Sequence, residues 1–125
     1  MGLGTGVLMG RGVARFLGRG PKVVRPPNRG FLGQPTPTVL QPGMMIDRYG
    51  FDTGTFASPA GTPFQLRALP PAQASSPYSV FEIVQPLEVQ AGITAPWFGG
   101  GGGLQYELPT SITSLLESGA IRRLP

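Results

Sequence analysis

The chain has 125 residues and a mass of 13.1 kDa, enough for one domain with a modest core. Glycine and proline make up 35 of the residues, whereas cysteine and histidine are both absent. Their absence excludes disulfide scaffolds, cysteine nucleophiles, zinc sites with cysteine or histidine ligands, and catalytic triads built on histidine.

The net charge of +4 is unevenly distributed along the chain. Residues 1–46 hold six basic residues and no acidic residue, whereas residues 47–125 have a net charge of −2. A slightly acidic body gives no indication of a nucleic-acid-binding groove. No apolar run approaches the ~20 residues of a membrane span, and we expect none. A chain that opens on a Gly-rich basic arm is typical of a C-terminal piece of a longer protein.

Residues 1–43 are predicted to form a Gly/Pro-rich basic linker or arm. Val13, Phe16 and Leu17 have helical spacing, but the glycines around them favour at most a short, frayed turn. Three prolines in residues 31–43 predict an extended connector. A solvated linker explains this composition better than an arm that binds membranes or nucleic acid, because its charges are not interleaved with aromatic residues.

The body, predicted to span residues 44–125, is mostly strand. Residues 44–46 are predicted as a strand or a buried turn that ends at residue 47, and residues 55–57 as a second short strand. Residues 64–69 hold at most one helical turn, because two prolines follow. Alternation of apolar and polar residues predicts three longer strands, at 78–84, 87–92 and 104–108.

A short helix is predicted after these strands. Ser111 is a suitable N-cap, Ile112, Leu115 and Leu116 lie on one helical face, and Gly119 suits the C-terminal end. A last strand is predicted at residues 120–124. The fold class is therefore α+β, mainly β, with small antiparallel or mixed sheets, one or two short helices and Gly/Pro-rich loops. A Rossmann or P-loop fold is poorly supported, because βαβ alternation and the phosphate-binding glycine motifs are missing.

The most distinctive stretch is residues 97–108, in which an aromatic pair runs into five glycines and then an alternating strand. Burial of Leu104, Tyr106 and Leu108 on one face turns Gln105 and Glu107 together toward the other face, beside the glycines. Taken by residue type alone, this is more often a solvated strand face beside a flexible linker, with the aromatic pair in the core.

Several motifs follow one another in order from residue 47: Asp47-Arg48-Tyr49-Gly50, Gly54-Thr55-Phe56, Arg67-Ala68-Leu69-Pro70-Pro71, Ala95-Pro96-Trp97-Phe98-Gly99 and Gln105-Tyr106. Together they resemble the tuberculosis necrotizing toxin domain family over the last 79 residues of the chain. The resemblance implies an NAD(P)+ glycohydrolase that cleaves the nicotinamide–ribose bond to give nicotinamide and ADP-ribose, and so depletes the NAD of a target cell.

The resemblance also implies the roles of individual residues. The essential arginine of the family corresponds to Arg48, its aromatic partner to Phe56 and its glutamine to Gln105. Phe56 stands where other members have tyrosine, which removes a hydroxyl contact but keeps a ring that can stack on the substrate. Arg48 suits the pyrophosphate, and Gln105 suits a ribose hydroxyl or the attacking water through either end of its amide.

Four further residues are candidates for substrate binding. Tyr49 and Gly50 adjoin Arg48, and Gly50 offers a backbone N–H. Arg67 suits a phosphate, although a structural ion pair explains it equally well. Glu107 lies two residues after Gln105 and suits electrostatic support of a positively charged ribosyl centre.

The reaction requires no metal and no cofactor, since NAD+ or NADP+ is the substrate. Asp47 and Asp52, with loop carbonyls, leave a calcium site as an alternative, although their spacing fits no known calcium loop. The resemblance implies a cognate immunity protein that blocks the active site, and a protein that is secreted or delivered into target cells as the C-terminal part of a larger toxin and acts in their cytosol. The alternatives are an ADP-ribosyltransferase toxin acting on a protein, and a non-catalytic interaction module.

Overall fold

The computed structural model describes residues 26–125, and the frayed turn predicted at Val13, Phe16 and Leu17 lies outside them. Seven strands form one antiparallel sheet in the order β2-β6-β7-β4-β3-β5-β8. The strands are β2 (Thr36–Leu40), β3 (Met45–Tyr49), β4 (Phe56–Pro59), β5 (Tyr78–Ile83), β6 (Leu87–Ile93), β7 (Leu104–Glu107) and β8 (Ile121–Arg123). Three 3₁₀ turns, η1 (Pro27–Gly30), η2 (Phe64–Arg67) and η3 (Pro71–Ser75), and the helix α1 (Ile112–Ser118) accompany it. The predicted α+β, mainly β fold class is confirmed.

One face of the sheet carries the core. Ile46 lies directly opposite Phe81 and Ala57 opposite Tyr106, and all four side chains are buried. Because side chains alternate along a strand, the neighbours of these residues point to the other face, where the site lies. Leu104, predicted to share the core face, is 36% exposed, because β4 pairs only with the last part of β7.

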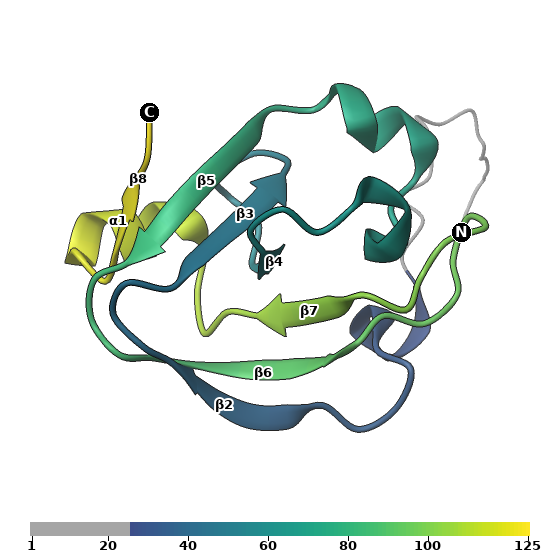
Figure 1. Cartoon of the computed structure of the whole chain (residues 1–125), viewed down its shortest axis with the longest axis horizontal. Coiled ribbons are helices and arrows are strands. Elements are labelled where there is room, and N and C mark those ends of the chain that lie inside the picture. Colours follow the sequence, from purple (N-terminus) through teal and green to yellow (C-terminus); the bar gives the residue numbers. More distant parts are fainter. Residues whose placement is uncertain (1–25) are drawn as a thin grey trace, which may run out of the picture.

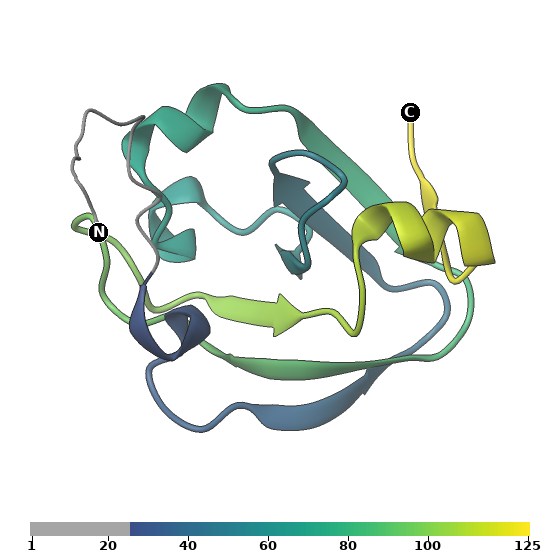
Figure 2. The same cartoon turned by 180° about the vertical axis from the view of Figure 1, so that it is seen from behind.

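Helix α1 forms as the sequence predicts. The Ser111 side chain accepts a hydrogen bond from the Ser114 N–H at 3.1 Å, and Gly119 ends the helix with a φ of 80°. Ile112 and Leu115 are buried against the sheet. In both views α1 lies beside β8, at the end of the molecule opposite the three 3₁₀ turns (Figures 1 and 2). In residues 26–125, α1 and the 3₁₀ turns are all too short to cross a membrane.

The segment before residue 44 is not only a connector. β2 pairs with β6 along five residues, and Leu40 is 1% exposed in the core. Phe31 is also buried and bridges to Thr94. The described part of the predicted arm therefore contains the edge strand β2 and the segment that leads into it. The buried apolar side chains of Phe31 and Leu40 anchor this part to the sheet.

The sheet corrects the predicted end of one strand, whereas the predicted helical turn is present. β3 runs on through Tyr49 instead of ending at residue 47, because β5 pairs with it along its whole length. The predicted helical turn at residues 64–69 is the 3₁₀ turn η2, and a second turn, η3, begins at Pro71. Proline at the first position of η3 fixes a helical φ where no N–H donor is needed.

Candidate active site

A cleft with a volume of about 420 Å³ opens beside the turns. This volume falls within the range of about 300–1,000 Å³ that is typical of small-molecule sites. The cleft gathers every predicted site residue except Gly50, and its full lining is Pro26, Arg29, Gly30, Arg48, Tyr49, Phe56, Arg67, Ala68, Leu69, Pro70, Gln73, Ala95, Trp97, Gln105 and Glu107. Residues far apart in the sequence therefore meet in one concave site.

The strand register explains why Phe56, Gln105 and Glu107 meet. Phe56 on β4 lies directly opposite Glu107 on β7, so their side chains share one face of the sheet. Gln105 precedes Glu107 by two residues and points to the same face. Across β7, Gln105 lies opposite Gly92, which has no side chain and leaves room for the Phe31 ring.

Arg48 reaches the cleft beside the backbone of β4. Its Nε donates to the Phe51 carbonyl and its Nη1 to the Phe56 carbonyl, both at 2.9 Å. Burial lowers the pKa of the Arg48 guanidinium, and the nearby Asp52 carboxylate opposes this change. Arginine nevertheless stays protonated at any physiological pH, so the cleft contains a half-buried fixed cation.

Two glycines make room for this guanidinium. A Cβ at Gly54 would lie 1.9 Å from Arg48 Nη2, and a Cβ at Gly50 would lie 2.7 Å from the same atom. Gly50 also has a φ of 144° and its N–H donates to the Pro77 carbonyl. The Gly50 N–H, expected to face the substrate, is thus used within the fold, and the missing side chain of Gly50 leaves space for the Arg48 guanidinium.

Arg67 lies on the cleft floor in a buried ion pair. Its Nη1 lies 2.7 Å from Asp47 Oδ1 and its Nη2 donates to Oδ2 at 2.8 Å, while Nε and Nη2 donate to the Thr62 carbonyl. Tyr49 covers the guanidinium, with its ring centroid 4.8 Å away. Of the two alternatives from the sequence, the structure contains the ion pair, as expected of charges that are 5% and 0% exposed.

The glycine run is packed, not a flexible linker. Gly101 and Gly103 donate to the carbonyls of Gln65 and Leu66 in η2 at 2.9 and 3.0 Å. The aromatic pair before the run is not core: Trp97 lines the cleft and Phe98 is 49% exposed. The run holds η2, and with it Arg67, against the strand that carries Gln105.

Comparisons with known proteins show the family of the chain. The profile named "Tuberculosis necrotizing toxin" matches residues 39–124. The chain belongs to the tuberculosis necrotizing toxin family. It is 35% identical over 118 residues to the conidial surface nicotinamide adenine dinucleotide glycohydrolase of Aspergillus fumigatus, covering 81% of this chain. The chain spans 49% of the length of that relative.

Two solved structures share the fold of this family member. The structure of tuberculosis necrotizing toxin complexed with its immunity factor IFT superposes with a TM-score of 0.63 at 23% identity, covering 78% of this chain and 60% of that one. The structure of Tse6 in complex with Tsi6 gives 0.52 at 21% identity, covering 72% and 71%. At these identities the two structures support the fold alone.

In this member of the tuberculosis necrotizing toxin family, Arg29 also lines the cleft, which the sequence does not predict. Its Nε donates to Glu107 Oε1 at 2.8 Å, and its carbonyl oxygen accepts a hydrogen bond from Gln105 Nε2 at 3.1 Å. Both contacts span more than 70 positions, and in the sequence Arg29 belongs to the predicted basic arm. Glu107, predicted to support a cationic centre, has its charge balanced by this arginine.

The carboxylates considered for calcium have basic partners. Asp47 pairs with Arg67 and also accepts hydrogen bonds from the Gly61 N–H and the Tyr78 hydroxyl, at 2.8 and 2.6 Å. Asp52 pairs with Arg123. Within residues 26–125, no three histidine, cysteine, aspartate or glutamate side chains come together as a metal site would require.

Proposed function

We propose that this chain is the catalytic domain of an NAD(P)+ glycohydrolase. The observation that carries the proposal is the cleft that contains Arg48, Phe56 and Gln105 together, brought from β3, β4 and β7. Membership of the family and the name of the Aspergillus fumigatus relative support the same activity.

The reaction needs positioning more than acid catalysis. The C1′–N1 bond breaks with its electron pair moving to the pyridinium nitrogen, so nicotinamide leaves as a neutral molecule. A water oxygen bonds to C1′ and releases one proton, which gives ADP-ribose. The site therefore has to hold the dinucleotide, place the water and stabilise an oxocarbenium-like ribosyl centre.

Arg48 is assigned to the pyrophosphate. Two of its five N–H groups are used by the Phe51 and Phe56 carbonyls, which leaves three without a partner within residues 26–125. These two contacts fix the plane of the guanidinium, so little conformational entropy is lost when a phosphate binds. The Arg67 guanidinium, held by Asp47 and the Thr62 carbonyl, adds a second positive charge on the cleft floor.

The aromatic residues and Gln105 are assigned to the other half of the substrate. Phe56 offers a ring for nicotinamide or ribose, with Tyr49 on the adjoining wall. Gln105 lies on the same face, where its amide can hydrogen-bond a ribose hydroxyl or the attacking water. Glu107, whose charge Arg29 balances, holds this part of the cleft in place.

The test is nicotinamide release from NAD+ and from NADP+ by the purified chain, with Gln105→Ala and Arg48→Ala. We expect each variant to lower kcat/KM by about 10²–10³-fold, the cost of removing one stabilising group at the reacting centre. Arg122→Ala, which removes an exposed ion pair with Glu82, is the matched control and is expected to be fully active.

Circular dichroism spectra of the variants identify any that are unfolded. Failure of the native chain to consume either nucleotide would contradict the proposal. If ADP-ribose is transferred to a protein instead of to water, the chain is an ADP-ribosyltransferase and the glycohydrolase proposal is wrong.

We further propose that a cognate immunity protein covers this cleft and that the chain acts in the cytosol of a target cell after secretion or delivery as part of a larger toxin. Both solved relatives are complexes with a second protein, which supports the first proposal. Co-purification of the chain with a neighbouring gene product, with loss of nicotinamide release in the complex, tests it.

A further inference from the structure

The segment from Pro26 to Gly30, here called the N-terminal turn, lies at the cleft although it precedes the part of the chain that the family profile matches. Three of its residues line the cleft: Pro26, Arg29 and Gly30. A solvated linker would have no reason to contact the two polar residues of β7 that face the cleft.

The backbone of the N-terminal turn is strained and firmly anchored. Asn28 and Arg29 have φ angles of 53° and 54°, a left-handed conformation that is unfavourable for a residue with a side chain such as arginine. The Asn28 side chain donates to the Phe31 and Gly33 carbonyls at 2.9 and 3.0 Å. Just after it, Phe31 is buried and the Ala95 N–H donates to the Gly30 carbonyl at 2.8 Å.

The contact with Gln105 has a chemical consequence. A backbone carbonyl can only accept a hydrogen bond, so the Arg29 carbonyl requires the nitrogen end of the Gln105 amide at 3.1 Å. With Nε2 held by the turn, Oε1 remains as an acceptor. Gly30 lies against the same amide, since a Cβ there would be 3.5 Å from both Nε2 and Oε1.

A second contact holds the turn over β7. The Arg29 guanidinium pairs with Glu107, whose side chain is 24% exposed and lies two residues along the same strand face as Gln105. The N-terminal turn thus contacts both polar residues of β7. The Arg29 backbone carbonyl binds Gln105, and the Arg29 side chain binds Glu107.

We infer that the N-terminal turn is a positioning element of the active site, with Arg29 as its positioning residue. It fixes the Gln105 amide so that Oε1 accepts a hydrogen bond from a ribose hydroxyl or from the attacking water. This inference rests on the proposed function. It goes beyond that function by assigning the acceptor role to Oε1 of Gln105 and a positioning role to a segment outside the matched family region.

A different role for Arg29 would be direct binding of a substrate phosphate. A phosphate ligand would be needed equally in the ground state and the transition state, so its loss raises KM. A positioning residue that acts through Gln105 affects the reacting geometry, so its loss lowers kcat. The two roles therefore separate kinetically.

The kinetic test uses the full chain with Arg29→Ala, Arg29→Lys, Glu107→Gln and the double variant Arg29→Ala/Glu107→Gln. We expect Arg29→Ala to lower kcat about tenfold with KM changed less than twofold, and lysine to restore part of the loss by pairing with Glu107. Glu107→Gln is expected to lower kcat as much as Arg29→Ala does. The double variant is expected to lower kcat no further than either single variant, because each single variant already removes the same ion pair.

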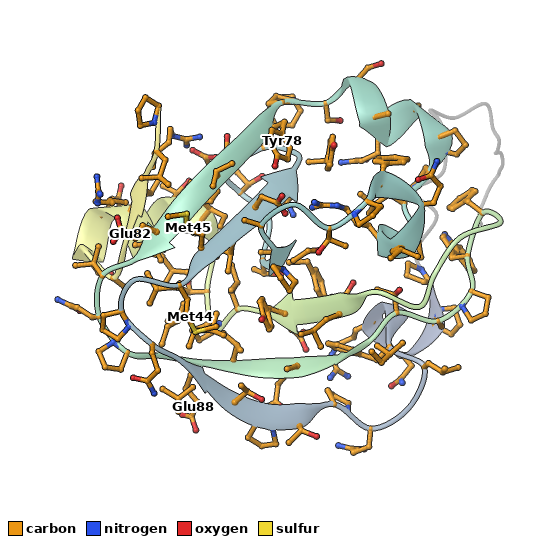
Figure 3. All side chains as sticks on the ribbon, viewed as in Figure 1. Met44, Met45, Tyr78, Glu82 and Glu88 are labelled. Carbon is orange, nitrogen blue, oxygen red and sulfur yellow. The ribbon has the colours of Figure 1, made fainter. Side chains whose placement is uncertain are left out.

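Arg122→Ala, which breaks the exposed pair with Glu82 far from the turn, is the control for loss of a surface arginine (Figure 3). An unchanged kcat, a rise in KM alone, or additive losses in the double variant would overturn the inference.

A second measurement does not depend on activity. In nuclear magnetic resonance spectra, the Gln105 side-chain NH₂ signals, assigned by their absence in Gln105→Ala, should show a nuclear Overhauser effect to the Gly30 Hα protons. The effect should weaken in Arg29→Ala and persist in Arg122→Ala. Its absence from the native protein overturns the positioning contact, whereas an inactive native protein with the effect present contradicts only the proposed function.

Discussion

Tyr78 contacts the ion pair on the floor of the cleft. Its hydroxyl donates to Asp47 Oδ2 at 2.6 Å, beside the ion pair with Arg67. The hydrogen bond to Asp47, followed by burial, raises the pKa of Tyr78 from 10.0 to about 12. Tyr78 stands at one end of β5, and the Glu82 side chain lies toward the other end (Figure 3).

We predict that stability falls with rising pH between about 10 and 12, partly because of Tyr78. The unfolded phenol loses its proton near pH 10, whereas the folded one keeps it to about 12, so the unfolded chain binds fewer protons in this window. The stabilisation is complete below pH 10 and is lost as the pH passes 12. Urea unfolding of the native protein and Tyr78→Phe at pH 8 and at pH 11.5 measures it.

Tyr78→Phe should cost about 1 kcal/mol at pH 8, the net value of one hydrogen bond, and the cost should shrink at pH 11.5. Burial also raises the pKa of Tyr106, so the variant keeps part of the pH dependence. A cost that is the same at both pH values would show that the Tyr78 proton is not held by Asp47.

At the scale of elements, the glycine run acts through close backbone contacts with η2. A Cβ at Gly100 would lie 2.0 Å from the Gln65 carbonyl oxygen, and one at Gly103 would lie 2.8 Å from that of Leu66. Carbonyl oxygens in a hydrogen-bonded turn cannot move aside as a flexible side chain can. Gly100 and Gly103 are therefore required by packing density and not by flexibility.

Gly100→Ala is predicted to destabilise the protein by about 1–3 kcal/mol, the usual cost of overpacking. Gly33→Ala is the matched control, because a Cβ there meets no atom within 4 Å and its φ is not left-handed. Chemical unfolding of the two variants gives the comparison. Equal stability of Gly100→Ala and the native protein would mean that the run is flexible after all.

Elements with strong local signals could be predicted from the sequence. β5, β6 and α1 lie where the alternation and the Ser111 cap indicated, because side-chain period and capping are properties of neighbouring residues. The sequence does not predict β2, because Pro37 weakens its strand pattern. Proline is tolerated in β2 because it is an edge strand, where a missing N–H costs little.

The site could be predicted only in part, for a related reason. Arg48, Phe56 and Gln105 lie in recognisable motifs, and the cleft contains all three. The partner of Arg67 depends on how β3 and η2 pack. The contacts of Arg29 depend on how the N-terminal turn packs against β7, more than 70 positions away in the sequence. Neither leaves a pattern in nearby residues.

At the scale of the whole molecule, the folded unit extends to residues before the predicted boundary at 44. Phe31 and Leu40 are 3% and 1% exposed, and β2 covers one side of β6 along five residue pairs. Loss of two such side chains costs about 5 kcal/mol or more, comparable to the whole stability of a small domain. We therefore propose that the catalytic unit begins at or before Pro26.

Two truncated chains and two point variants test this boundary. The chain of residues 26–125 is predicted to keep both the unfolding midpoint and the rate of nicotinamide release of the full chain, because all the described contacts of the cleft remain. The chain of residues 44–125 is predicted to be largely unfolded and inactive. In the full chain, Leu40→Ala should cost about 2–5 kcal/mol and Val39→Ala, on the exposed side of the same strand, much less. A folded and fully active chain of residues 44–125 would restore the boundary at 44, and inactivity of the folded 26–125 chain would assign a function to the basic residues before it.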